Sequence, residues 1–277
     1  MRTIKLTLAY DGTAYAGWQV QPERPTVQAV LEATIEKVTG RASRTVASGR
    51  TDAGVHALGQ IVGFQTESQL PVEVLQRALS AELPGDIAVL DAAEVPEGFH
   101  PIRDALRKRY RYVIHDGPVR DVFGRFYCWH YTHGRLDAEA MHRAAQCLLG
   151  KHDFGSFEST GAERETSVRT IFDIFVRRTG QGGARPTLLD KPAVAPGAPD
   201  AADQGRAGGG ARIVLEVEAD GFLYNMVRAI VGTLVEVGRG AQPESWVAEV
   251  LAAADRSAAG PTAPPQGLFL VNVDYSV

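Results

Sequence analysis

The stretch Ala47-Ser48-Gly49-Arg50-Thr51-Asp52-Ala53-Gly54-Val55-His56-Ala57 holds an acid, a base, a hydroxyl and two glycines between strand-like segments at 43–47 and 58–65. Gly49 and Gly54 permit backbone angles closed to other residues, so the loop can turn tightly and approach a ligand closely. Thr51 and Asp52 can bond to local backbone groups and hold the turn. On spacing alone this is a hairpin-like loop with Asp52 as a turn residue. The rest of the chain favours a functional role.

Size and composition indicate an ordinary globular protein. The 277 residues, 44% hydrophobic and 22% charged, can form one large domain or two modest ones. No apolar run approaches the roughly 20 residues that span a bilayer, and residues 1–5 lack the apolar core of a signal peptide, so a cytoplasmic location is expected. Cys128 and Cys147 are too few for a disulfide framework and lack metal-ligand spacing, so both are expected to pack as small core side chains.

Charge is unevenly distributed along the chain. The net charge of −4 and the pI near 6.0 argue against a nonspecific polyanion binder. Two basic clusters stand out nevertheless: Arg103, Arg107, Lys108, Arg109 and Arg111, and, before the central loop, Arg41, Arg44 and Arg50. A run of charges is most often a solvated face, but a local basic patch is compatible with a defined, structured nucleic acid.

Hydrophobic periodicity predicts the elements of a first half, residues 1–115. Strands are expected over 2–10, 43–47, 58–65, 87–90 and 107–115, and helices over 26–39 and 71–82. Gly40 closes the first helix, and Pro71 begins the second. Alternation in the last strand places Tyr110, Tyr112 and Ile114 on one face and Arg109, Arg111 and Val113 on the other.

The second half, residues 116–277, repeats this style. Helices are predicted over 137–149, 222–237 and 244–253, and strands over 167–177, 211–219 and 268–273. Residues 179–210 are rich in Gly, Pro, Ala and Asp, with almost no large apolar residue, and are expected to form a long flexible insertion. Many connections are too short for parallel crossovers, so the expected class is α+β, with a largely antiparallel sheet and helices on one side.

Familiar signatures of nucleotide-binding and hydrolytic sites are missing from the sequence. It contains no Gly-x-Gly-x-x-Gly after a strand, no Gly-x-x-x-x-Gly-Lys and no Gly-x-Ser-x-Gly. His130 and His133 are three residues apart without a third ligand, which favours a surface pair over a zinc site. A site without metal or cofactor is the expectation.

Arg228 lies in a predicted helix that is apolar on most of its circumference. A guanidinium in such surroundings costs several kcal/mol unless a carboxylate or phosphate meets it, and Asp52 is the candidate partner. Gly232, one turn later, would let another segment approach closely. The alternative is that Arg228 lies on a narrow exposed stripe or reaches water through its long side chain.

Tyr110 has two interpretations. An aromatic residue at an inward strand position usually belongs to the core. Here four basic residues surround it in the sequence, as expected where a base stacks on a ring while phosphates meet Arg and Lys.

Three separated motifs together resemble the tRNA pseudouridine synthase A family. They are Tyr10-Asp11-Gly12-Thr13 with Gly17-Trp18-Gln19, then Gly49-Arg50-Thr51-Asp52-Ala53-Gly54-Val55-His56, then Phe222 to Gly232 with Met226-Val227-Arg228. Supporting stretches are 83–87, 109–112, 152–154 and 267–268. The likeness covers nearly the whole chain, in order, except for 179–210.

This resemblance implies a pseudouridine synthase fold with two similar halves flanking a central cleft. It also implies a homodimer that converts uridine to pseudouridine at positions 38–40 of the tRNA anticodon arm, without a cofactor. By position, Asp52 is the nucleophile and Tyr110 contacts the substrate base. Arg228 pairs with the catalytic carboxylate, and Arg50 is its basic neighbour.

The chain departs from the family pattern at two places. Phe99-His100 is followed by Pro101-Ile102-Arg103 rather than Ala-Arg, which shifts the arginine by one residue. The 179–210 segment has no family counterpart and no assigned role. Two other classes compete with the enzyme: a non-catalytic RNA-binding module using the basic 103–111 run, and a structural or protein-interaction domain. Neither needs the Asp52 loop or a buried Arg228.

Overall fold

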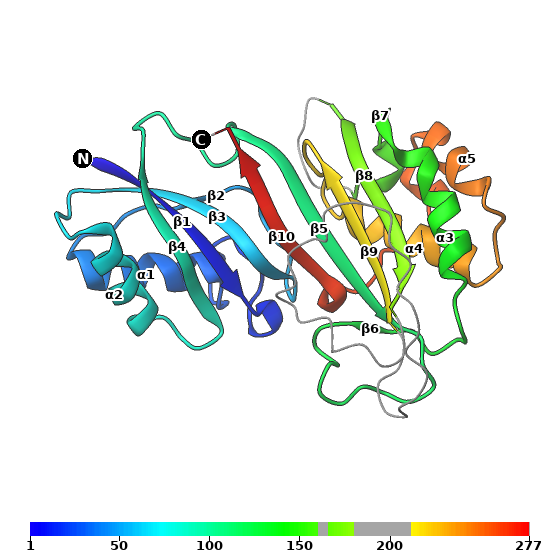
Figure 1. Ribbon diagram of the computed structural model, residues 1–277, viewed down its shortest axis with the longest axis horizontal. Helices are drawn as coiled ribbons and strands as arrows, with labels where there is room; N and C mark the ends of the chain where they lie inside the picture. Colours follow the sequence, from blue (N-terminus) through cyan, green and yellow to red (C-terminus); the bar gives the residue numbers. More distant parts are fainter. Residues whose placement is uncertain (160–165, 180–211, 277) are drawn as a thin grey trace, which may run out of the picture. The chain divides into compact units, whose positions relative to one another are not determined.

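The computed structural model describes residues 1–159, 166–179 and 212–276 (Figure 1). The predicted insertion at 179–210 lies outside this part except for Thr179. The chain divides into two compact units, the first made of Met1–Arg111, Glu218–Gly221 and Leu268–Val277, the second of Tyr112–Val217 and Phe222–Gly267. The sequence predicts one boundary after residue 115, whereas the chain crosses between the units four times, first between Arg111 and Tyr112.

The first unit is built on strands β1 (Arg2–Tyr10), β3 (His56–Thr66), β4 (Ile87–Val95), β5 (Ala105–His115) and β10 (Leu268–Tyr275). Their order is β4-β1-β3-β10-β5, and the short β2 (Val46–Ala47) pairs with β3. β1 is antiparallel to both β3 and β4, but β10 is parallel to β3. The sheet is therefore mixed, because β10 arrives after a long excursion of the chain and not through a hairpin.

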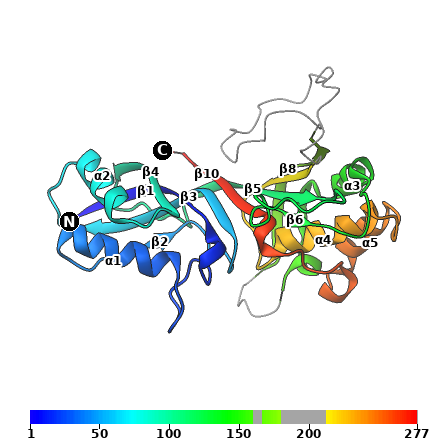
Figure 2. The same ribbon diagram turned by 90° about the horizontal axis from the view of Figure 1, so that it is seen from below.

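Two helices cover the apolar side chains of this unit. α1 (Val27–Thr39) begins after the N-cap Thr26 and ends at Gly40, which takes φ 76°, as the sequence predicts. α2 (Val72–Glu82) follows Pro71 and packs on β4 and α1. Figure 2 shows α1 lying along the strands of the first unit. The core between them includes fully buried side chains: Ile4, Leu6, Leu8, Leu31, Ile35, Leu75 and Leu79.

The second unit contains the end of β5, β6 (Trp129–His130), β7 (Gly150–Asp153), β8 (Val168–Arg178) and β9 (Arg212–Ala219), in the order β5-β9-β8-β7 with β6 on β5. Its helices are α3 (Ala138–Ala145), α4 (Met226–Gly238) and α5 (Trp246–Ala253). α3 packs on β8 and α4. Asp137 caps α3 by accepting bonds from two backbone N–H groups, and the predicted end at 149 is replaced by a 3-10 turn, Gln146–Leu148.

α4 starts four residues later than the sequence predicts, because Asn225 takes a left-handed conformation with φ 60° that precedes the first helical turn. The helix is buried nearly all round. A Cβ on Gly232 would lie 1.6 Å from the carbonyl oxygen of Pro261, so the 260–263 segment runs directly against the helix at this glycine. The backbone N–H of Ala263 donates to the carbonyl of Arg228 at 3.0 Å. The predicted close approach at Gly232 is confirmed.

Gly232→Ala is expected to lower the free energy of unfolding by about 3 kcal/mol or more, because the new methyl group overlaps backbone that cannot move aside as a side chain can. Gly85→Ala is the matched control, since its Cβ would have open space within 4 Å; it should change stability by less than about 1 kcal/mol. Chemical denaturation of both variants measures the difference. Equal stabilities would contradict the packing described for α4.

Candidate active site

The Asp52 loop connects β2 to β3 in the first unit. Gly54 has φ 76°, as the sequence predicts. Gly49 does not have a positive φ, and a Cβ there would only reach an ordinary contact of 3.6 Å with the Lys108 Nζ, so its predicted need for unusual backbone angles is wrong. The backbone N–H of Val55 donates to the Asp52 carbonyl at 3.1 Å and closes the turn.

The segment that follows β1 supports this loop from behind. Gly17, with φ 93°, would place a Cβ 2.6 Å from the Thr51 carbonyl oxygen, and a Cβ on Gly12 would lie 1.9 Å from that of Val55. The backbone N–H of Trp18 donates to the Thr51 carbonyl at 3.0 Å. The glycines that permit the closest approach are therefore Gly12 and Gly17, in the Tyr10–Gln19 motif. The sequence marks this motif, but nothing in its local pattern indicates that its glycines contact the loop.

A buried polar cluster lies under the loop. The Tyr10 hydroxyl contacts the Thr51 Oγ1 at 2.8 Å, so Thr51 bonds to a side chain of β1 and not, as expected, only to local backbone. Gln60, on β3, donates from Nε2 to the Gly49 carbonyl at 2.8 Å, and its Oε1 accepts from the Ser48 Oγ at 2.6 Å. Burial raises the pKa of Tyr10 to about 12, against the lowering effect of its bonds to Thr51 and Gln60.

His56 ties the two motifs together at the end of the loop. Its side chain is buried and stacks on Phe269, with ring centroids 4.7 Å apart. The His56 Nδ1 accepts the backbone N–H of Gly12 at 3.1 Å, and an Asp11 carboxylate oxygen lies 3.1 Å from the same nitrogen. His56 therefore holds the turn after β1 against the first residue of β3.

β5 brings two of its side chains to the Asp52 loop. Tyr110 is buried, and its pKa is raised by that burial and then by the nearby Tyr10 and Asp52 groups, so it lies within electrostatic reach of Asp52. Lys108, two residues earlier on the same face of the strand, donates from Nζ to the Ser48 carbonyl at 2.6 Å. The structure thus places Asp52 and Tyr110 in one neighbourhood.

The basic run on β5 is not the open phosphate-binding face that its composition suggests. Arg107 and Arg109, on the opposite face from Tyr110, both bond to the Glu218 carboxylate at 3.0 and 2.9 Å. Arg111 is only 7% exposed. The shifted Arg103 is exposed and bonds to Asp104 and to the Gly98 carbonyl. These partners neutralise much of the run.

Arg50 and Arg228 differ in their surroundings. Arg50 is exposed and forms no hydrogen bond or ion pair within the part of the chain described here. Arg228, in the first turn of α4, is half-buried; its Nε donates to the Ala263 carbonyl at 2.7 Å and its Nη1 to the Asn225 Oδ1 at 2.8 Å. The guanidinium is therefore anchored by its own unit. Its pairing with Asp52, which lies in the first unit, stays a prediction.

The histidines, the cysteines and the helices are the features that bear on a metal site or a membrane span. No cluster of metal-ligating side chains occurs among the described residues, and none of the helices in those ranges is long and apolar enough to cross a membrane. The His130 ring stacks on His115, and the His133 ring packs edge-on against Tyr131. Cys128 is buried as expected, whereas Cys147 is partly exposed.

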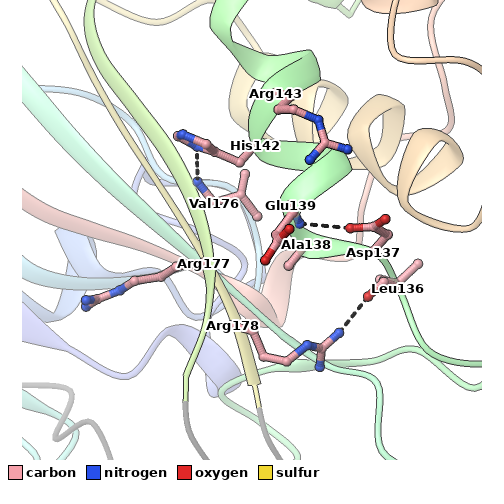
Figure 3. A pocket seen from close by; sticks show the side chains of 9 residues that line it. All are labelled: Leu136, Asp137, Ala138, Glu139, His142, Arg143, Val176, Arg177 and Arg178. Atoms are coloured by element: carbon pink, nitrogen blue, oxygen red, sulfur yellow. Dashed lines mark hydrogen bonds between the residues drawn. The ribbon is translucent and has the colours of Figure 1, made fainter. Parts of the chain in front are cut away.

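A cavity of about 610 Å³ lies between α3 and β8 in the second unit (Figure 3). His142 and Arg143 of α3 line it, together with Arg177 and Arg178 of β8. Val176 donates its backbone N–H to the His142 Nδ1, and Arg178 donates to the Leu136 carbonyl. None of the residues predicted from the sequence to form the site lines this cavity.

Comparison with known proteins identifies the class. The family model described as "tRNA pseudouridine synthase" matches residues 7–102 and 144–276, which include Arg50, Asp52 and Arg228 but not Tyr110. The mixed α+β fold is consistent with that family. The chain therefore belongs to the tRNA pseudouridine synthase family, whose members are isomerases acting on tRNA.

Three relatives that match nearly the whole chain share one name, tRNA pseudouridine synthase A. The tRNA pseudouridine synthase A of Moorella thermoacetica is 45% identical over 277 residues, covering 99% of this chain and all of the relative. That of Geotalea daltonii is 42% identical over 275 residues, with 99% and 100% covered. That of Halalkalibacterium halodurans is 44% identical over 270 residues, with 97% and 91% covered.

The buried tyrosines predict an alkaline instability. Tyr10, Tyr110 and Tyr112 all have pKa values raised above 10, first of all by burial. Above pH 10 the unfolded chain releases these protons while the native protein retains them, so the free energy of unfolding should fall as pH rises from about 10 to 12. Tyrosinate absorbance, followed together with circular dichroism, measures this. If all eight tyrosines ionised near pH 10 with the fold intact, their described burial would be wrong.

Proposed function

We propose that this protein converts uridine to pseudouridine at positions 38–40 of the tRNA anticodon stem-loop, with Asp52 as nucleophile and without a cofactor. The placement of Asp52 carries this proposal: it lies in a loop backed by glycines and a buried polar cluster, close to Tyr110. The loop also falls within the residues matched by the family model.

The reaction is an isomerisation, so no atom or electron is gained or lost. The N1–C1′ bond breaks, the base turns, C5 bonds to C1′, and the hydrogen lost from C5 is balanced by a proton gained at N1. The Asp52 carboxylate can open this sequence by attacking C1′ of the ribose or C6 of the base, and its later departure restores the free enzyme. Both routes use the same residue and need neither metal nor redox chemistry.

The target uridine must leave its stack before a carboxylate can reach it. We assign Tyr110 to contact with the substrate base, because an aromatic ring near Asp52 offers a stacking surface. Arg50, exposed two residues before Asp52, is suited to contact the RNA backbone. Arg228 would pair with the Asp52 carboxylate and fix its direction, since Ala263 and Asn225 already hold its guanidinium.

The proposal also includes an assembly and a location. We propose a homodimer acting in the cytoplasm on the anticodon arm. Support comes from the family and from the resemblance of the motifs. A fixed RNA shape, recognised through a few exposed cations, is compatible with the net charge of −4.

Replacing the nucleophile tests the reaction. Asp52→Asn keeps the size of the side chain but removes the carboxylate, so pseudouridine formation on a tRNA transcript should fall by at least about 10⁴-fold. Binding of the transcript should remain within about twofold of wild type. Glu67→Gln, an exposed carboxylate on the same unit, serves as control and should remain active. Turnover retained by Asp52→Asn would remove the nucleophile assignment; wild-type binding without isomerisation would favour the RNA-binding module.

A double-mutant cycle tests the pairing of Asp52 with Arg228. The free energies of unfolding of wild type, Asp52→Asn, Arg228→Gln and the double variant should give a coupling of about 1–3 kcal/mol. Denaturant titration near neutral pH measures all four. Additivity within about 0.5 kcal/mol would show that the two side chains do not interact.

A further inference from the structure

Gln60, on the central strand β3, is a fully buried amide that lies under the Asp52 loop. It contacts the two residues that lead into Arg50-Thr51-Asp52: the Ser48 Oγ at 2.6 Å and the Gly49 carbonyl oxygen at 2.8 Å. A carbonyl oxygen can only accept, so the amide must direct its nitrogen to Gly49 and its oxygen to the Ser48 hydroxyl. The orientation of Gln60 is therefore fixed by its partners.

A second connection runs from Gln60 through Tyr10. The Nε2 lies 3.4 Å from the Tyr10 hydroxyl oxygen, which is itself 2.8 Å from the Thr51 Oγ1. When the amide donates to that oxygen, the Tyr10 proton is left to donate to Thr51. One buried side chain thus restrains the loop at Ser48 and Gly49 directly and at Thr51 through Tyr10.

The strand geometry explains how Tyr10 reaches this place. Leu8 pairs with Gln60, whereas Tyr10 pairs with Ala57, so the β1–β3 ladder is irregular between these positions. Such irregularities turn a side chain away from its regular direction. Gly59 lies within the irregularity, and a Cβ there would be 2.6 Å from the Val271 carbonyl oxygen. At this irregularity β3 has one extra residue, and position 59 has no side chain. Tyr10 contacts Gln60 and the loop at the same place.

We infer that Gln60 is a positioning residue for the isomerisation: by holding Ser48, Gly49 and, through Tyr10, Thr51, it sets the direction of the Asp52 carboxylate. This rests on the proposed role of Asp52 as nucleophile. Gln60 does not touch the reacting atoms; it removes alternative conformations of the backbone that carries Asp52. A displaced nucleophile slows the bond-making step while leaving the exposed RNA contacts in place.

Two variants at this position separate its functions. Gln60→Met has a similar length and removes every hydrogen bond of the amide. Gln60→Glu keeps an acceptor for the Ser48 hydroxyl but, when ionised, places a negative charge against the Gly49 carbonyl oxygen. Both should lower kcat at saturating tRNA by about 10- to 100-fold, with the tRNA Kd changed less than about twofold. The defect of Gln60→Glu should shrink as pH falls and the carboxyl group gains a proton that it can donate.

Gln28→Met is the matched control for loss of stability. Gln28 is also a buried glutamine, but its amide bonds to Val20, Glu32 and Thr45, none of which belongs to Ser48–Asp52. Gln28→Met should lower the Tm by about as much as Gln60→Met does. Its kcat should stay within about twofold of the wild-type value. If Gln60→Met does not fold, Tyr10→Phe decides: it removes the hydroxyl that joins Gln60 to Thr51, keeps the bonds of Gln60 to Ser48 and Gly49, and should lower kcat by about three- to tenfold.

The outcomes distinguish this inference from the proposed function. Wild type that forms pseudouridine, with Asp52→Asn inactive and Gln60→Met reduced in kcat but not in tRNA binding, supports both. If wild type is active and Asp52→Asn is inactive, but the kcat of Gln60→Met is unchanged or is lowered no more than that of Gln28→Met, the positioning role alone is overturned. If Gln60→Met cannot be measured, an unchanged kcat in Tyr10→Phe overturns the positioning role of Gln60. Activity retained by Asp52→Asn instead overturns the proposed function.

Discussion

Close backbone packing behind the Asp52 loop is the constraint on which the rest of the site depends. Gly12 and Gly17 allow the segment after β1 to touch the carbonyl groups of Val55 and Thr51, at distances that no other residue permits. The backbone of the loop is therefore set by the first unit itself. The nucleophile proposed here needs this kind of support, because a carboxylate on a freely moving loop would spend little time in a productive direction.

The buried polar cluster adds direction to this packing. Tyr10, Ser48 and Gln60 lie almost entirely out of water, where an unmade hydrogen bond is costly and a satisfied one is correspondingly restrictive. On the other face of β5, Glu218 holds the largely buried Arg109 and the more exposed Arg107. The basic run consequently contributes less positive surface than its composition suggests, which agrees with an acidic protein that recognises a defined RNA.

Local sequence pattern predicts the structure best where neighbouring residues decide it. Gly40 ends α1 as predicted, and Gly232 marks a close backbone approach. Local pattern does not predict the structure where contacts between distant residues decide it. The parallel pairing of β10 with β3, the ion pairing of Arg107 and Arg109 with Glu218, and the contact of Thr51 with Tyr10 join positions far apart in the chain. Asn225 could have indicated the late start of α4, since Asn tolerates the left-handed conformation.

Mapping of pseudouridine in cellular tRNA tests the central claim most directly. In tRNA from cells that lack this protein, uridines at positions 38–40 should be unmodified, and expression of the wild-type chain should restore pseudouridine there. Expression of Asp52→Ala at an equal level should not. Restoration of these positions by Asp52→Ala would contradict the account, because it would show that the carboxylate held by this loop is not required for the reaction.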